Sequence, residues 1–417
     1  MLAKVFGGVV ERAYRTPRIT AEDLQTEIAN GRDVAIFDAR TFEEFQAGSL
    51  PGAISCPLAE LPARVPDAAP SPDTLIIVNC ASRTRGILGA QSLLNLSLPN
   101  PIAVLENGVM AWSLAGGALV ERAGRVAAPP AQRTLSARRD TARQLAARFA
   151  IPLIGCRVLE KFKGDDYRSL YLFDVRTPEA YAAGHRKDAR SASGGQLIMT
   201  FPQFVGTHLA RVVLTDGGDG LTAVTTALWL AQIARRQILL LIDDEQDEVA
   251  TGPERVQASG LTSGVAKLSA AQASASLARN EATVLDLDSS LAYRAGHIPK
   301  ARFAIRSRLP IGLDAIEADR TLILTSSDGV LAELAAQDLA SQRPVLALAG
   351  GTAAWSAAGL PLEAGTGNPL HPFEDLWPSP MRAPGSRLEG FRRYLAWQTS
   401  VADQARQEDT LAFDLRV

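Results

Sequence analysis

The sequence predicts an α/β protein built from three tandem modules, each a parallel β-sheet flanked by helices, followed by a C-terminal helical tail. Two observations carry this prediction. Short apolar stretches alternate with stretches of helical periodicity, which is typical of parallel sheets covered by helices on both faces. One phrase of sequence also occurs three times in the same order, and such internal repetition indicates a repeated structural unit.

The repeated phrase begins with an apolar strand that ends in an aspartate. This residue is Asp38 in the first module, Asp174 in the second and Asp286 in the third. A short helix and a turn rich in glycine follow each strand. The turns read Gly48-Ser49-Leu50-Pro51, Gly184-His185 and Gly296-His297-Ile298-Pro299.

A second apolar strand in each module leads into a short polar loop. In the first module the run Leu75–Val78 leads to Cys80, which lies 42 residues after Asp38. The same spacing selects Asp216 in the second module, and a spacing of 41 selects Ser327 in the third. The first module thus has a thiol in this loop and the other two do not, so we expect those two to be inactive.

A helix and a further strand complete each module. The helices are expected at 86–96, 222–234 and 330–341, and the strands at 102–105, 238–242 and 345–348. Related phrases ending in Trp112 and Trp355 close the first and third modules, and we expect both indole rings in the core. Ligands of open parallel sheets bind at the C-terminal ends of the strands, which is where the sequence places Cys80.

Proline and glycine clusters divide the chain into four expected domains, 1–126, 127–250, 251–363 and 364–417. Pro129-Pro130 and Gly252-Pro253 mark the first two boundaries, and a helix at 136–149 is expected to open the second module. The tail contains Pro369, Pro372, Pro378, Pro380 and Pro384, followed by an amphipathic helix expected from about Arg387 to Arg406. The apolar residues of this helix, Leu388, Phe391, Tyr394, Leu395 and Trp397, predict that it docks on the body, with partner binding as the alternative.

Cys80 has the neighbours that a reactive thiol requires. It precedes a helix, and Arg83 and Arg85 follow it closely. A helix N-terminus and nearby guanidinium groups stabilise a thiolate, and the loop amides there can hold an anion. Cys56 and Cys156 lack basic neighbours in this pattern, so we expect them to be packing residues.

Composition excludes several functions. The net charge of −2 over 417 residues gives no reason to expect a nucleic-acid or membrane partner. Three widely spaced cysteines argue against a disulfide framework, and a cytoplasmic location is the expectation. His185 and His297 have no carboxylate or cysteine at metal-ligand spacing, so neither a metal nor another cofactor is expected.

Taken in order, these landmarks resemble the rhodanese (thiosulfate sulfurtransferase) family over roughly residues 19 to 363. The resemblance implies that Cys80 is catalytic and carries a persulfide. It also implies that the loop residues Ala81, Ser82, Arg83, Thr84, Arg85 and Gly86 wrap this sulfur with backbone amides. Asp38 and Arg40 lie at a strand end that faces the site in this fold, and either substrate binding or a fold-holding pair explains them.

Two positions depart from the family pattern. Ser49 replaces a common histidine in the turn, and Arg83 replaces a common glycine in the loop, which would bias the site toward an anionic donor. The implied activity is transfer of sulfane sulfur from thiosulfate or a similar small donor to a thiol, a protein or cyanide. A non-catalytic sulfur-sensing or protein-binding scaffold remains an alternative. A phosphatase or arsenate reductase is disfavoured, because related phosphatases use a seven-residue loop and Cys80–Arg85 spans six residues.

Overall fold

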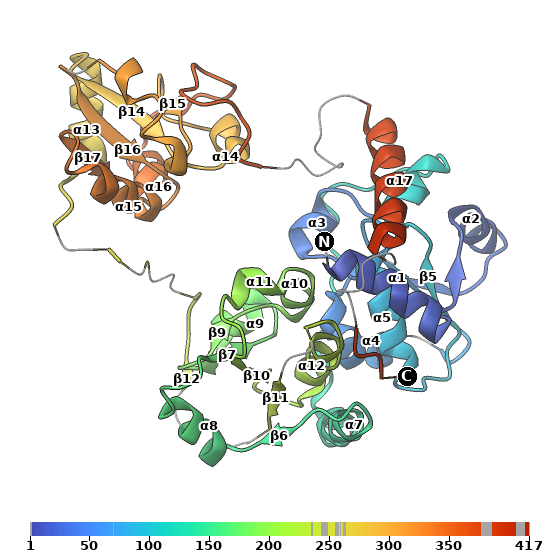
Figure 1. The fold of residues 1–417 in the computed structure, drawn as a ribbon. Coiled ribbons are helices and arrows are strands. Elements are labelled where there is room, and N and C mark those ends of the chain that lie inside the picture. Colours follow the sequence, from blue (N-terminus) through green and yellow to red (C-terminus); the bar gives the residue numbers. More distant parts are fainter. Residues whose placement is uncertain are drawn as a thin grey trace. The chain divides into compact units, whose positions relative to one another are not determined.

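The computed structural model describes residues 2–69, 71–234, 237–242, 249–254, 258, 260–261, 264–317, 319–376, 386–405 and 413–416. Its contacts divide the chain into two compact units. One unit comprises Met1–Glu254 and Pro380–Val417, and the other comprises Arg255–Ser379. The first unit therefore contains the first two modules and the C-terminal helix, and the second contains the third module (Figure 1).

The first module is a five-stranded parallel sheet with strand order β1-β5-β4-β2-β3. Its strands are β1 (Arg18–Ile19), β2 (Val34–Asp38), β3 (Ile54–Ser55), β4 (Leu75–Asn79) and β5 (Ile102–Leu105). Its helices are α1 (Leu2–Tyr14), α2 (Ala21–Ala29), α3 (Phe42–Gln46), α4 (Leu61–Ala68), α5 (Thr84–Leu94) and α6 (Gly108–Leu114). All five residues of the central strand β4 are buried, as expected for a parallel strand covered on both faces.

The second module repeats this sheet with strand order β6-β11-β10-β7-β9. Its strands are β6 (Leu153–Ile154), β7 (Leu170–Asp174), β9 (Arg190–Ser191), β10 (Arg211–Thr215) and β11 (Ile238–Leu241). Its helices are α7 (Leu135–Arg148), α8 (Cys156–Lys163), α9 (Pro178–Ala183), α10 (Gly194–Met199), α11 (Phe201–Phe204) and α12 (Leu221–Ala234). A separate antiparallel pair joins β8 (His185–Arg186) to β12 (Val249–Ala250).

The third module has strand order β13-β17-β16-β14-β15, the same path through the sheet as in the other two. Its strands are β13 (Lys267–Leu268), β14 (Ala282–Asp286), β15 (Arg302–Phe303), β16 (Thr321–Thr325) and β17 (Val345–Leu348). Its helices are α13 (Ala270–Ala278), α14 (Ser290–Ala295), α15 (Val330–Leu339) and α16 (Gly351–Ala357). The predicted fold class, parallel sheets flanked by helices and repeated along the chain, is confirmed.

Strand register corrects one predicted equivalence. Asp286 pairs with Thr325 across β14 and β16, as Asp38 pairs with Asn79 across β2 and β4. The residue after Thr325 is Ser326, so Ser326 rather than Ser327 stands where the first module has its thiol. The prediction erred because the connection between these two strands is two residues shorter in the third module. The residue five places after Ser326 is Leu331, which therefore stands where the first module has Arg85.

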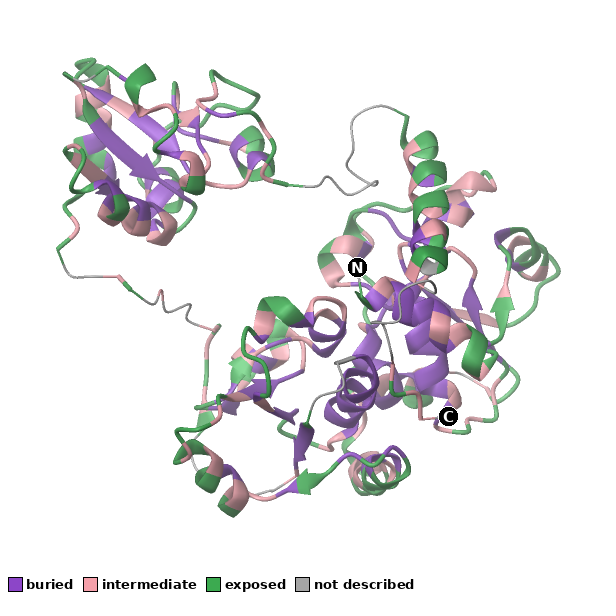
Figure 2. Cartoon of the chain, viewed as in Figure 1, coloured by how far each residue is buried: buried purple, intermediate pink, exposed green. Residues whose placement is uncertain are grey.

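The first two modules share one apolar core (Figure 2). Trp229 of α12 is fully buried, and its Nε1–H donates to Ser92 Oγ of α5 at 2.8 Å. On α10, a Cβ at Gly194 would lie 2.7 Å from Ala59 Cβ in the first module. A side chain at that position would push the modules apart, so glycine permits their close approach.

The C-terminal helix α17 (Arg387–Ala405) packs against α1 and α6. Phe391 and Val401 are buried in this contact, whereas Leu388 and Trp397 remain about 40% exposed, so the predicted apolar face docks only in part. Arg406 and the prolines Pro378, Pro380 and Pro384 lie outside the described residues. Among the helices that are described, none has the length and apolar composition to cross a membrane.

Candidate active site

Cys80 follows the last residue of β4 and immediately precedes the loop into α5. Its side chain is 3% exposed. Asn79, the residue before it, donates from Nδ2 to Asp38 Oδ2 at 3.1 Å, and Asn79 O accepts the N–H of Ala39 at 2.8 Å. A Cβ at Gly86 would lie 3.5 Å from Cys80 Sγ. The strand thus delivers the thiol to the first turn of α5, as predicted.

Helix α6 holds the Cys80 loop through backbone hydrogen bonds. The N–H groups of Val109 and Met110 donate to the carbonyls of Cys80 and Ala81 at 2.9 and 3.2 Å. A Cβ on Gly108 would lie 2.1 Å from Cys80 O, and Gly108 has a φ of +54°. Both the close approach and the backbone conformation require glycine. Trp112 of the same phrase is buried, as expected, and donates from Nε1 to Ala118 O at 2.9 Å.

The loop after Cys80 has open backbone donors. Within the part of the chain that the structure describes, the N–H groups of residues 81–86 donate no hydrogen bond to the chain. The hydroxyl of Thr84 is also buried there without a hydrogen-bond partner. Buried N–H groups are nearly always paired in proteins. Open donors at the N-terminus of an 11-residue helix therefore make a site that can accept an anion.

Both loop arginines contact carboxylates from neighbouring helices. Arg83 pairs with Glu11 of α1. Arg85 makes two parallel contacts to Glu44 of α3, one of them from Nη2 to Oε1 at 2.7 Å. Burial alone would raise the pKa of Glu44, but the hydrogen bonds and charge of Arg85 prevail and lower it to about 2. Glu44 in turn raises the pKa of Arg85 against the effect of burial.

Asp38 and Arg40 form a buried pair. Arg40 donates from Nε and Nη2 to the two carboxylate oxygens of Asp38, the shortest contact being 2.7 Å, and Nη2 also donates to Gly48 O. Arg176 repeats these contacts with Asp174 and Gly184 O in the second module. The pair ties the strand end to the following turn in both modules, with or without a thiol nearby.

A cavity of about 250 Å³ opens beside the Cys80 loop. It is lined in the first module by Ala39, Arg40, Thr41, Phe42, Glu43, Pro57 and Arg85, and in the second by Thr177, Pro178, Glu179, Ser193, Gly195 and Gln196. The same part of the repeated phrase, Arg40–Glu43 and Thr177–Glu179, lines it from both sides. The modules are held together here by Glu60, which accepts the N–H of Thr177 at 3.0 Å. Sequence reasoning missed this second wall, although the repeat had marked the segment.

Comparison with known proteins places this geometry in a family. The model of the rhodanese-like domain matches residues 20–115 and 269–358. The crystal structure of thiosulfate sulfurtransferase from Pseudomonas aeruginosa superposes with a TM-score of 0.92 at 36% identity, covering 99% of this chain and 79% of that one. The chain belongs to the rhodanese (thiosulfate sulfurtransferase) family.

Single-module structures match a part of this rhodanese chain. A rhodanese-related protein from Thermoplasma volcanium is 22% identical over 24% of this chain and 97% of its own, with a TM-score of 0.22. A rhodanese-like domain protein from Staphylococcus aureus is 19% identical over 24% and 98%, also with a TM-score of 0.22. No curated protein matches the chain.

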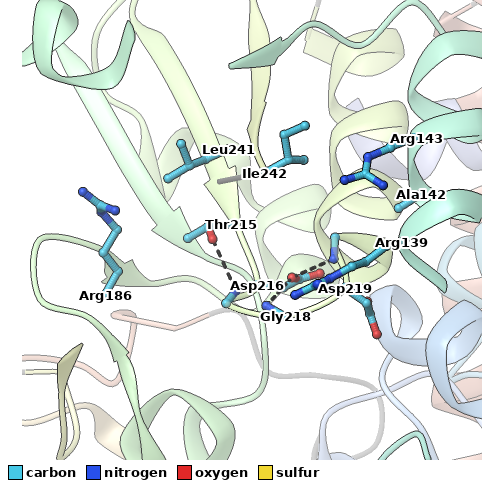
Figure 3. Close-up of a pocket in the computed structure, with 12 residues that line it drawn as sticks. Arg139, Ala142, Arg143, Arg186, Thr215, Asp216, Gly218, Asp219, Leu241 and Ile242 are labelled. Atoms are coloured by element: carbon cyan, nitrogen blue, oxygen red, sulfur yellow. Dashed lines mark hydrogen bonds between the residues drawn. The ribbon is translucent and has the colours of Figure 1, made fainter. Parts of the chain in front are cut away.

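The second rhodanese module fills its loop with its own carboxylate (Figure 3). Asp216 stands in the place of Cys80, and its Oδ1 accepts the N–H groups of Gly218 and Gly220 at 3.1 and 3.0 Å. Its Oδ2 accepts the N–H of Ala223 at 3.1 Å. Burial and the charge of Asp219 raise the pKa of Asp216, and the three N–H groups oppose that rise. In this loop of the second module, the chain's own carboxylate thus accepts the N–H groups of Gly218, Gly220 and Ala223.

The third rhodanese module fills its loop with different side chains. Ser326 Oγ accepts the N–H of Ala332 at 3.3 Å, and Asp328 Oδ1 accepts that of Val330 at 2.9 Å. Ser327 donates to both oxygens of Asp288, which replaces the arginine of the other modules. Of the three loops, the first alone combines a thiol with open N–H groups in the described residues.

The two remaining cysteines differ from each other. Burial raises the pKa of the Cys56 thiol, which fits the packing role predicted for it. Cys156 begins α8 and is half-buried, and Arg186 Nη1 donates to its sulfur at 3.5 Å. Arg186 lies 30 residues from Cys156 in sequence, so this contact forms only through folding and not through a sequence pattern like that of Cys80. Within the described ranges, no group of three or more histidine, cysteine or acidic residues could hold a metal ion.

Proposed function

We propose that this protein is a sulfurtransferase in which Cys80 carries sulfane sulfur as a persulfide. One observation supports this most directly: a thiol at the N-terminus of α5 is surrounded by backbone donors that bind nothing within the described chain. The equivalent loop of the second module holds a carboxylate with the same kind of donor. A terminal persulfide sulfur is also an anion, so the open donors would stabilise it.

The proposed reaction is a double displacement. The Cys80 thiolate attacks the outer sulfur of thiosulfate, the S–S bond of the donor breaks, and sulfite leaves with the bonding electron pair. The product is a Cys80 persulfide, and the total charge is unchanged. A thiolate or cyanide then attacks the terminal sulfur and regenerates the Cys80 thiolate. Ala81, Ser82, Arg83, Thr84, Arg85 and Gly86 would contribute the backbone donors.

Thiosulfate is proposed as a donor because the Pseudomonas aeruginosa protein is named as a thiosulfate sulfurtransferase. The cavity beside the loop is large enough for a small donor, and Arg85 lines it. No cofactor is invoked, since the sulfur is carried covalently by Cys80. The second and third modules, without a loop thiol, are proposed to be inactive, and the second would serve as a wall of the cavity beside the Cys80 loop.

Intact-mass spectrometry after incubation with thiosulfate tests this proposal. We expect the wild-type chain to gain about 32 Da, one sulfur, and to release an equivalent of sulfite. Cys80→Ser should abolish both signals. Cys156→Ser is the matched control, because it removes a half-buried thiol beside an arginine and should change neither signal. Undiminished sulfite release by Cys80→Ser would refute the proposal, and a protein that gains no sulfur from any donor would favour the scaffold alternative.

A further inference from the structure

The two cations of the Cys80 loop are neutralised before any donor binds. Arg85, side chain 12% exposed, faces the carboxylate of Glu44 with both terminal nitrogens. Arg83 is paired with Glu11 through a single contact, from Nη2 to Oε2. These contacts run against the prediction that two loop arginines bias the site toward an anionic donor. A guanidinium that is already paired attracts a further anion less strongly than a free one does.

Glu44 is held in place independently of Arg85. It is the third residue of α3, where its N–H donates to Thr41 Oγ1 at 3.3 Å and its Oε2 accepts the N–H of Thr41 at 3.2 Å. This reciprocal capping arrangement fixes the carboxylate at the start of the helix. When the sulfonate group of thiosulfate approaches Arg85, it must therefore share the guanidinium with the carboxylate of Glu44.

The cavity walls add no net positive charge. Of the residues that line the cavity, Arg40 and Arg85 are cationic, and Glu43 and Glu179 are anionic. Arg40 is itself committed to Asp38. When the carboxylates that pair with the two arginines are included, negative charges exceed positive ones around the cavity. A doubly charged donor experiences this excess about twice as strongly as a singly charged one.

We propose that Glu44 determines donor specificity: by neutralising Arg85, it makes the Cys80 site favour a singly charged sulfane-sulfur donor over the dianion thiosulfate. This inference rests on the proposed persulfide chemistry at Cys80. An organic thiosulfonate is a suitable singly charged probe. The Cys80 thiolate takes its outer sulfur, the S–S bond breaks, and an organic sulfinate leaves with the electron pair, so charge and atoms balance.

The test compares the rate of Cys80 persulfide formation with thiosulfate and with benzenethiosulfonate in the full-length chain. Glu44→Gln removes the charge, and glutamine still closes the capping box at this helix position. We expect this variant to raise kcat/KM for thiosulfate by about fivefold or more, mainly through KM, while the value for benzenethiosulfonate changes less. Glu27→Gln is the control, since it breaks a surface ion pair with Arg32 in the same module and should leave both rates unchanged.

The dependence of the rate on ionic strength supplies a second test of the same substitution. The wild-type rate with thiosulfate should rise as salt increases, because the repulsion by the excess negative charge is screened, whereas the Glu44→Gln rate should rise less or fall, because attraction to the unpaired Arg85 is screened as well. An unchanged ratio of the two donors in Glu44→Gln, or an equal loss with both, would overturn the inference and leave the proposed function intact. Absence of persulfide in the wild-type chain with either donor would instead overturn the proposed function.

Discussion

One aspartate of the repeated phrase has opposite surroundings in two modules. Asp38 is fully buried and bound by Arg40. Asp286 is equally buried, but Asp288 stands where the arginine would be, and Asp286 Oδ2 has no hydrogen-bond partner in the described structure. Burial, followed by the charge of Asp288, raises the pKa of Asp286 from 3.8 to about 7. The folded third module is therefore more stable when the buried carboxyl group of Asp286 is protonated than when it is ionised.

The stability of the third module should therefore fall between about pH 4 and pH 7. A carboxyl group whose pKa is raised by folding stabilises the folded state below its unfolded pKa, and that contribution disappears as pH rises through the folded value. Asp286→Asn removes the charge, so we expect it to stabilise the module at pH 8 by roughly 2 kcal/mol and to have little effect at pH 4. Hydrogen exchange of peptides from 264–317, followed by mass spectrometry in the full chain, measures this.

The corresponding substitution in the first module should lower the stability of the folded state instead of raising it. Asp38→Asn leaves the buried Arg40 guanidinium without its anion, which typically destabilises a protein by about 3–5 kcal/mol. We expect this loss at pH 8, where Asp286→Asn is stabilising. Equal effects of the two substitutions would mean that the neighbouring arginine does not decide the role of this aspartate.

At the scale of elements, α6 positions the Cys80 loop through backbone contacts. Gly108 allows the N-terminus of α6 to reach the carbonyl of Cys80, and Gly351 allows α16 to reach that of Ser326 in the third module. A Cβ on Gly351 would lie 1.9 Å from Ser326 O. The glycine of this phrase therefore has a structural role that does not depend on the thiol.

Gly108→Ala should displace α6 from the Cys80 loop. The added methyl group would overlap Cys80 O, and we expect a destabilisation of at least about 2 kcal/mol and a persulfide formation rate at least about tenfold lower. Gly116→Ala is the matched control. Gly116 also has a positive φ, +81°, but no heavy atom lies within 4 Å of the position of its Cβ. The Gly116→Ala variant should be destabilised by only about 1 kcal/mol and should form the persulfide at the wild-type rate. Equal rates in the two variants would contradict the positioning role of α6.

At the scale of the whole molecule, the third module interrupts the first unit in sequence. Residues 413–416 return to that unit after it: Phe413 contacts Phe6 with ring centroids 5.1 Å apart, and Tyr14 Oη donates to Arg416 O at 2.8 Å. The apolar core shared by the first two modules contains no residue of the third. The first unit is therefore complete without the inserted module. The domain boundaries expected from the sequence, including 127–250 for the second module, stay predictions.

Replacement of residues 255–379 by a flexible glycine–serine linker should leave the first unit folded. We expect the melting temperature of that unit to change by less than about 4 °C, a shift that corresponds to roughly 1 kcal/mol, and Cys80 persulfide to form at the wild-type rate. Calorimetry and intact-mass spectrometry measure these two properties. Loss of persulfide formation in a folded deletion protein would show that the third module contributes to the site.

The sequence by itself determined the repeated modules, most strands and helices, and the place of Cys80. These features depend on local patterns. Examples are the run of four apolar residues in β4 that ends beside a loop, and the helical spacing of apolar residues in α5. Even so, α5 begins at Thr84 rather than at the predicted Gly86, because the loop geometry sets where the helix starts. The connection between β14 and β16 is two residues shorter than that between β2 and β4, and only the strand register shows this. Ser326, rather than the predicted Ser327, is therefore the equivalent of Cys80.

Only the tertiary structure decided the electrostatics of the site. Arg83 and Arg85 look like free cations beside a thiol in the sequence, yet Glu11 and Glu44, 72 and 41 residues away, neutralise them. The second module contributes Thr177 and its neighbours to the wall of the same cavity. Such partners come together through packing of helices and modules, which no local pattern encodes. The sequence therefore located the reactive sulfur, and the fold set the charge that a donor meets there.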